Sequence, residues 1–137
     1  MAQYLVPQAG LQWLQDNDLA STTLYLLLID ADGFTALGET DTMASHAGWT
    51  ELADYSESVR QTWNHLGTSA GIMSNPAGAN FTCNAAASAI GWALVTDSTK
   101  SGTSGTLLVM VLNDSEVERV VGETWTVIHK MIYRSGG

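Results

Sequence analysis

The sequence has 137 residues and only one cysteine, Cys83. A single cysteine excludes an intramolecular disulfide and any metal site made of several thiolates. Cys83 follows Phe81 by two residues in a stretch with the alternation of a strand. The two side chains would share one face of that strand, so we expect the thiol to be a small buried side chain.

Basic residues are scarce as well. Five lysines and arginines stand against fourteen aspartates and glutamates, which gives a formal net charge of -9. Binding to nucleic acid needs a basic patch that neutralises phosphates, so we expect no nucleic-acid partner. The acidic excess lies in the first half of the chain, because no basic residue precedes Arg60 and the charges balance from there on.

Long hydrophobic runs are also missing. The longest apolar run, residues 24–29, has the length of a strand and not of a membrane span. Residues 1–8 have no basic stretch followed by an apolar one, which a signal peptide would need. We therefore expect neither a membrane partner nor a secretion signal, and a single domain with a real core.

The chain lacks the common signatures of catalysis, such as a phosphate-binding loop or a nucleophile elbow. Asp30, Asp32 and Asp41 have the outer spacing of a calcium loop, but Phe34 and Thr35 occupy the places of a required oxygen ligand and glycine.

Asp41, Ser45 and His46 have the residue types of a hydrolytic triad, yet adjacent residues of one loop rarely present nucleophile and base to each other. We expect these side chains to satisfy backbone groups in turns, and we predict no enzymatic activity, metal or cofactor.

What the chain does contain is a series of segments rich in β-branched, aromatic and aliphatic residues, separated by Gly, Ser, Asn and Asp. This rhythm predicts a mainly β protein, an antiparallel β-sandwich of jelly-roll or Greek-key type. The last segment alternates most cleanly, with Trp125, Val127, His129 and Met131 on one face. The predicted strands are residues 22–30, 59–66, 71–75, 79–85, 88–96, 106–113 and 124–134.

Two further parts complete the predicted fold. Residues 7–16 begin with Pro7 and place apolar residues at helical spacing, which predicts a short helix. We therefore expect residues 1–20 to form an N-terminal arm and helix, and residues 21–137 to form the sandwich body. Residues 34–58 have no sustained period and predict a long loop, with a short strand near 34–37 and a turn or strand near 50–55.

Five tryptophans are present, at positions 13, 49, 63, 92 and 125. Trp63, Trp92 and Trp125 lie in predicted strands, so we expect them in the core. Trp13 and Trp49 lie in the helix and the long loop, where an aromatic side chain anchors its segment either to the body or to a neighbouring subunit. The sequence leaves both roles open.

Four stretches together resemble small virion structural proteins of tailed bacteriophages. They are residues 41–51 (DTMASHAGWTE), followed by Tyr55 and Arg60, and residues 75–82 (NPAGANFT), 90–95 (IGWALV) and 98–107 (STKSGTSGTL). The resemblance covers roughly residues 22–134 and consists of turn and strand patterns. It implies a non-enzymatic particle component, a decoration or cement protein on the outer surface of the phage head.

Several expectations follow from this resemblance. The partners would be the major capsid protein and further copies of the chain in a homotrimer, and the protein would be made in the host cytoplasm and reside in the virion. We expect contacts from the arm, since termini are easily recruited to partners, and from residues 41–51, since long aperiodic loops are often functional. The predicted contact residues are Tyr4, Leu5, Val6, Pro7, Trp13, Met43, His46 and Trp49.

Two alternatives remain open at this stage. A tail- or fibre-associated adaptor could use the same sandwich, and it would differ from a decoration protein by its low copy number. A carbohydrate-binding module could use Trp49 and the acidic loops, and it would require a ring that is accessible to sugar.

Overall fold

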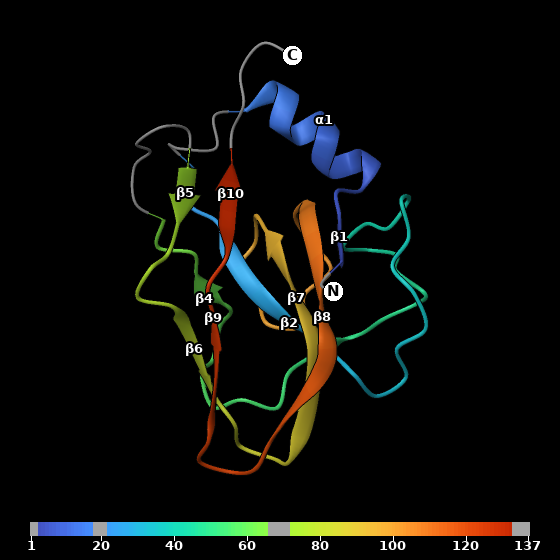
Figure 1. Cartoon of the computed structure of the whole chain (residues 1–137). Coiled ribbons are helices and arrows are strands. Elements are labelled where there is room, and N and C mark those ends of the chain that lie inside the picture. The colour runs from blue at the N-terminus through green and yellow to red at the C-terminus, as the bar shows by residue number, and fades with distance from the viewer. Residues whose placement is uncertain (1–2, 18–21, 66–71, 133–137) are drawn as a thin grey trace.

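The computed structural model describes residues 3–17, 22–65 and 72–132. It is mainly β, with antiparallel sheets and one short helix near the N-terminus, which confirms the predicted fold class. The strands form two layers, and a long loop adds a third covering on the far face of the larger sheet (Figure 1).

The larger layer is a six-stranded sheet in the order β1-β8-β7-β2-β3, in which β4 also pairs with β2. Strands β2, β7 and β8 are its centre, and their apolar residues are buried on both faces. Such strands read as continuous apolar runs because neither face meets water. The bounds are β1 (Gln3–Leu5), β2 (Tyr25–Asp30), β3 (Glu51–Leu52), β4 (Gln61–Thr62), β7 (Ala87–Val95) and β8 (Leu107–Arg119).

The second layer consists of two small sheets on one face of the larger one. One pairs β5 (Ile72–Ser74) with β10 (Lys130–Ile132), and the other pairs β6 (Ala79–Thr82) with β9 (Thr124–Val127). A hydrophobic core fills the space between the layers and includes Trp63, Phe81 and Trp125. Cys83 lies in this core at 1% exposure, as its position in the sequence predicted.

The opposite face of the larger sheet is covered by the long loop between β2 and β3. Met43 and Trp49 of this loop are 2% and 1% exposed, and they pack with Leu27 and Ile29 of β2 in a second core. The loop therefore replaces a layer of regular structure. Its segment 34–37 is not a strand, which corrects one expectation, whereas β3 lies within the predicted 50–55 segment.

The N-terminal residues belong to the body. β1 is the edge strand of the larger sheet, where Tyr4 lies opposite Val111 of β8. Helix α1 (Gln8–Asp16) follows at once and packs on β8. The backbones of α1 and β8 approach each other closely at Gly10, so a Cβ at this position would collide with the carbonyl of Leu108. The described residues of this segment, 3–17, therefore form an edge strand and a helix packed on the sheet, and not a separate arm over residues 1–20.

Other strand boundaries also differ from the prediction. The predicted strand 124–134 divides into β9 and β10, although its alternation is confirmed as far as Met131; Tyr133 and Arg134 lie outside the described residues. The predicted strand 59–66 reduces to β4, and β8 continues to Arg119. Residues 66 and 71, at the ends of two predicted strands, also lie outside the described part.

Candidate interaction site

The edge strand β1 lies at one side of the larger sheet, and its residues Gln3 and Tyr4 are exposed. Its inner side pairs with β8, and no strand of residues 3–17, 22–65 or 72–132 pairs with its outer side. Tyr4 at its centre is 76% exposed. The edge of a sheet presents unpaired N–H and C=O groups, which another extended chain can bind.

The direction of the backbone groups of β1 follows from its neighbours. The carbonyl of Val111 on β8 lies against Gly91 of β7, so Val111 points its backbone groups away from β1. Backbone groups alternate along an antiparallel strand, so the residues on either side of Val111 bond to Gln3 and Leu5. The N–H and C=O of Tyr4 therefore point outward, away from β8.

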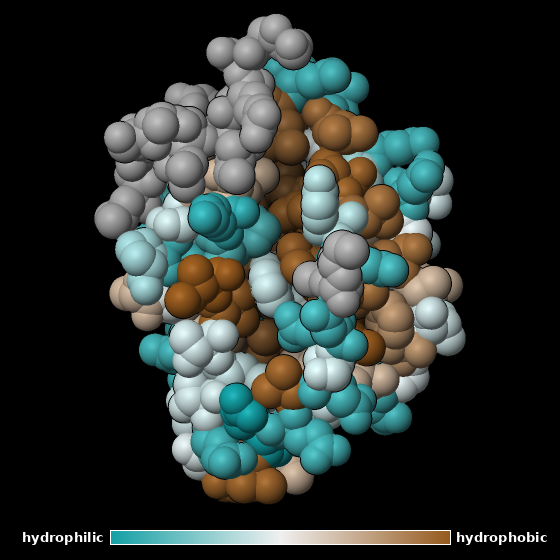
Figure 2. Space-filling model, in the orientation of Figure 1, coloured by the Kyte–Doolittle hydropathy of each residue, from teal (hydrophilic) through white to brown (hydrophobic). Residues whose placement is uncertain are grey.

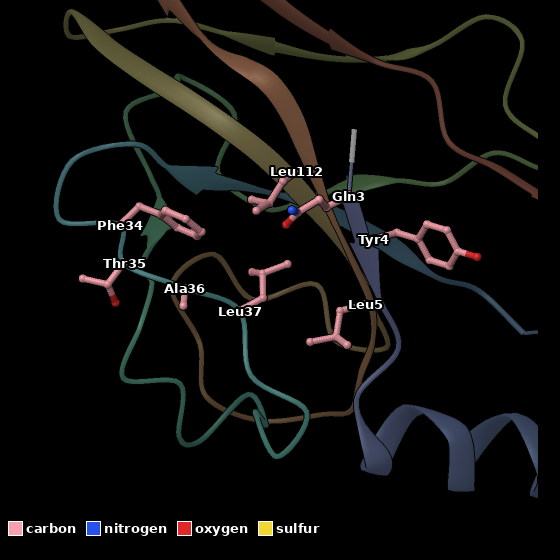
Figure 3. Close-up of a pocket in the computed structure, with 8 residues that line it drawn as sticks. All are labelled: Gln3, Tyr4, Leu5, Phe34, Thr35, Ala36, Leu37 and Leu112. Atoms are coloured by element: carbon pink, nitrogen blue, oxygen red, sulfur yellow. The ribbon is translucent and has the colours of Figure 1, made fainter. Parts of the chain in front are cut away.

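A first groove opens beside β1 on the face that the long loop covers, and we call it the loop-side groove. Figure 3 shows Leu5 and Leu112 on the same side of the sheet as Phe34 and Leu37, with Tyr4 pointing away from them. The cavity measures about 520 Å³. Leu5, Phe34 and Leu37 also pack against the second core, so its apolar floor is held by the body of the protein.

A second groove, the sandwich-side groove, opens on the other face between β1, β8 and β10. It measures about 470 Å³, and mostly apolar side chains line it. Figure 2 shows apolar surface gathered in this part of the molecule, below α1. The lining residues are Tyr4, Val6, Trp92, Val109, Val111, His129, Lys130 and Met131.

One wall of the sandwich-side groove depends on His129. The indole Nε1 of Trp92 donates a hydrogen bond of 3.0 Å to Nδ1 of His129, so the imidazole must be neutral to accept it. Burial lowers the pKa of His129 to about 4, because the charged ring would lose its water. Nε2 then carries the ring proton, and it has no hydrogen-bond partner among the described residues.

The predicted contact residues fall into three groups. Tyr4, Leu5 and Val6 line the grooves beside the edge. Pro7 is buried at the start of α1, and Trp13 is half-buried against the main core. The remaining three, Met43, His46 and Trp49, lie in the long loop.

These loop residues make their contacts with other residues of the protein. His46 stacks on Trp49 with ring centroids 3.8 Å apart, and its Nδ1 lies 2.8 Å from the Trp49 carbonyl oxygen. Asp41 accepts hydrogen bonds from Trp49 Nε1 at 3.0 Å and from the Gly38 amide at 2.8 Å. Because Trp49 is buried, its anchor role is to the body, and its ring offers no surface on which a sugar could stack.

The acidic residues that suggested a calcium loop are not brought together. Asp30 Oδ1 accepts the amide of Asp32, whereas Asp41 is engaged with Trp49 in the loop. Burial raises the pKa of Asp30; the hydrogen bond from the Asp32 amide opposes this shift, and the charges of Asp32 and Asp54 add to it. Within the described ranges, no group of three or more His, Cys, Asp or Glu side chains could hold a metal ion.

Several groove residues were missed by reasoning from the sequence. The sequence predicts a short strand at residues 34–37 in the long loop and places Lys130 and Met131 in the last strand, and neither prediction relates these residues to β1. Their proximity to β1 depends on the pairing of β1 with β8, which joins residues 3–5 to residues 110–112. The only local signal was the uncharged, strand-like composition of residues 3–6.

No helix in the described part of the chain is long and apolar enough to cross a membrane. No protein-family model matches this sequence, and neither a curated protein nor a solved structure matches the chain.

Proposed function

We propose that this protein is a structural component of a tailed-phage virion, a decoration protein that binds the outer surface of the capsid. The observation that carries the proposal is the open edge of β1 between two grooves, of which the sandwich-side groove is mostly apolar and the loop-side groove has an apolar floor. Such an edge supplies both backbone hydrogen bonds and side-chain pockets to a partner. The resemblance of residues 22–134 to virion structural proteins supports the major capsid protein as that partner.

The charge distribution supports an attachment face at this edge. Residues 3–15 contain no ionisable group other than Tyr4, whereas the chain as a whole carries a net charge of -9. Among the residues that the structure describes, Lys130 is the one formally charged residue that lines either groove. Apolar, uncharged surface suits the centre of an interface, and the acidic remainder keeps the free protein soluble.

Rebinding to capsids tests the proposal. Capsids assembled without this protein are mixed with the purified chain, sedimented, and analysed for occupancy, while light scattering gives the mass of the free protein. Decoration predicts saturation at hundreds of copies per particle, on the order of the number of capsid subunits. Saturation at about a dozen copies or fewer would instead indicate a tail or fibre adaptor, and absence of binding would reject both.

A pair of matched variants locates the attachment face. Leu11→Ser alters an apolar side chain on α1 that is 52% exposed, and Val121→Ser alters one in the β8–β9 turn that is 68% exposed. Both substitutions remove similar exposed apolar surface with little effect on folding. Attachment near β1 predicts weaker rebinding for Leu11→Ser only, and the reverse order would place the face at the β8–β9 turn.

A further inference from the structure

We propose that the outer edge of β1 is a strand-addition site, at which an extended segment of the partner pairs with β1 and extends the larger sheet. The mode of binding follows from the edge itself. The identity of the partner as the major capsid protein rests on the proposed function.

The backbone of β1 is prepared for this pairing. The N–H and C=O of Tyr4 point outward, and they lie at the centre of the strand. Proteins protect exposed edges with charged side chains, proline or bulges. Gln3, Tyr4 and Leu5 carry no charge, pair with β8 in regular register, and are followed by Pro7 only after the strand has ended. Apart from its short length of three residues, this edge therefore carries none of these protections.

The two grooves would receive the side chains of an added strand. Successive residues of a strand point to opposite faces of the sheet, so one set enters the loop-side groove and the alternate set enters the sandwich-side groove. Phe34 and Leu37 on one face and Met131 on the other require apolar residues in both sets. Lys130, which is exposed, favours a carboxylate or amide next to its ammonium group.

A bare extended segment fits this edge better than a second copy of the chain. The β1 strand of another copy would bring its own long-loop segment and β10, the two walls that already flank the edge here. Two copies would also each bring a net charge of -9. A strand without such walls can lie along β1 and contact Leu37 on one face of the sheet and Met131 on the other.

Two substitutions at one position separate backbone pairing from side-chain contact. Tyr4→Pro removes the outward N–H but leaves the amides of Gln3 and Leu5 that bond to β8, and proline is tolerated at such outward positions of an edge strand. Tyr4→Val removes the same ring and keeps the N–H. Strand addition predicts that Tyr4→Pro binds the protein-free capsids about tenfold more weakly than Tyr4→Val.

Hydrogen exchange provides a test without substitution. In wild-type protein, exchange of the Tyr4 amide is expected to be fast in solution and to slow by at least about tenfold on the capsid. Thermal unfolding of both variants shows whether Tyr4→Pro keeps the fold. If it does not, the exchange measurement decides.

The outcomes are distinguishable. Equal binding of the two folded variants, or an unchanged exchange rate on capsids that bind the wild-type protein, would overturn strand addition and leave the decoration role standing. Failure of the wild-type protein to bind would overturn the proposed function. A dimer in solution that Tyr4→Pro converts to a monomer would show that a second copy occupies the edge, contrary to the segment proposed here.

Discussion

At the residue scale, His129 makes the stability of the protein depend on pH. The unfolded chain takes up a proton near 6.5, the ordinary pKa of histidine, whereas burial lowers the pKa of folded His129 to about 4. Between these values the unfolded state binds more protons, so stability is lost as the pH falls through this range. We expect a loss of about 2 kcal/mol between about pH 7 and about pH 5.

Urea unfolding at the two pH values measures this effect in the wild-type protein and in His129→Gln. The variant lacks the ionisable ring but keeps an acceptor for Trp92 Nε1. The difference between the two proteins isolates His129 from other groups, such as Asp30, whose pKa burial raises. An equal pH dependence in both proteins would show that His129 is not the group responsible.

The ion pair between Arg60 and Glu51 is a second determinant at this scale. The two side chains are 0% and 7% exposed, with N–O distances of 2.7 and 2.9 Å, and Arg60 also donates to the carbonyls of Asp97 and Gly102. Glu51→Ala leaves a buried guanidinium without its counter-charge. We expect a loss of about 3–5 kcal/mol in the free energy of unfolding.

Chemical denaturation checks this value against Glu118→Ala on β8. Glu118 is exposed, so its removal is expected to change stability by less than about 0.5 kcal/mol. A similar small change for Glu51→Ala would mean that water reaches Arg60 and that the pair does not hold the loop at residues 97–102.

At the element scale, α1 tests whether packing or helix propensity dominates. Alanine favours helix over glycine by about 1 kcal/mol, so Gly10→Ala would stabilise an isolated helix. In the protein a Cβ at this position meets the backbone of β8, which cannot move aside as a side chain could. We expect Gly10→Ala to lower the stability by about 1–3 kcal/mol.

Thermal unfolding of Gly10→Ala and of Gln12→Ala gives the comparison. Gln12 is exposed on the same helix, and its replacement changes propensity without approaching β8. A rise in the melting temperature of Gly10→Ala would contradict the close packing of α1 on the sheet.

The role of the long loop as a covering layer can also be tested by a substitution. Trp49→Ala removes a side chain that fills the second core beside β2, and we expect a loss of about 3–5 kcal/mol. Ala47→Ser, in the same loop, is an exposed control. If the loop were a mobile contact arm, Trp49→Ala would cost as little as the control in a denaturation experiment.

These elements also show what the sequence could predict. Local patterns located α1, most of the strands and the buried face of residues 125–131, because period and burial are encoded by neighbouring residues. They did not predict that β1 would pair with β8 or that the loop would act as a layer. Both depend on residues that are distant in the sequence: Tyr4 pairs with Val111, and Met43 and Met110 belong to the same second core. The candidate site lies on those contacts, so only its uncharged strand residues could be predicted.

At the scale of the whole molecule, the separation of charge from the candidate site predicts how salt affects attachment. Apart from Lys130, no formally charged side chain of residues 3–17, 22–65 or 72–132 lines either groove. Interactions between exposed charges are screened within about 10 Å in ~0.1 M salt. We therefore expect the affinity for protein-free capsids to change less than about threefold between ~0.05 M and ~0.5 M salt.

Co-sedimentation across this range of salt is the measurement. A steep loss of occupancy would mean that the acidic first half of the chain meets a basic capsid surface, and it would move the attachment face away from β1.

The pairing of β1 with β8 also orders the events of folding. Gln3 pairs with Leu112, so β1 cannot pair until a strand about a hundred residues further along the chain has been made. Helix α1 packs on β8 as well, so it also cannot dock until β8 has been made. The outer edge of the sheet is thus completed last, and a copy that is truncated or still folding has no finished edge to present. Incorporation into a particle would then select for finished molecules.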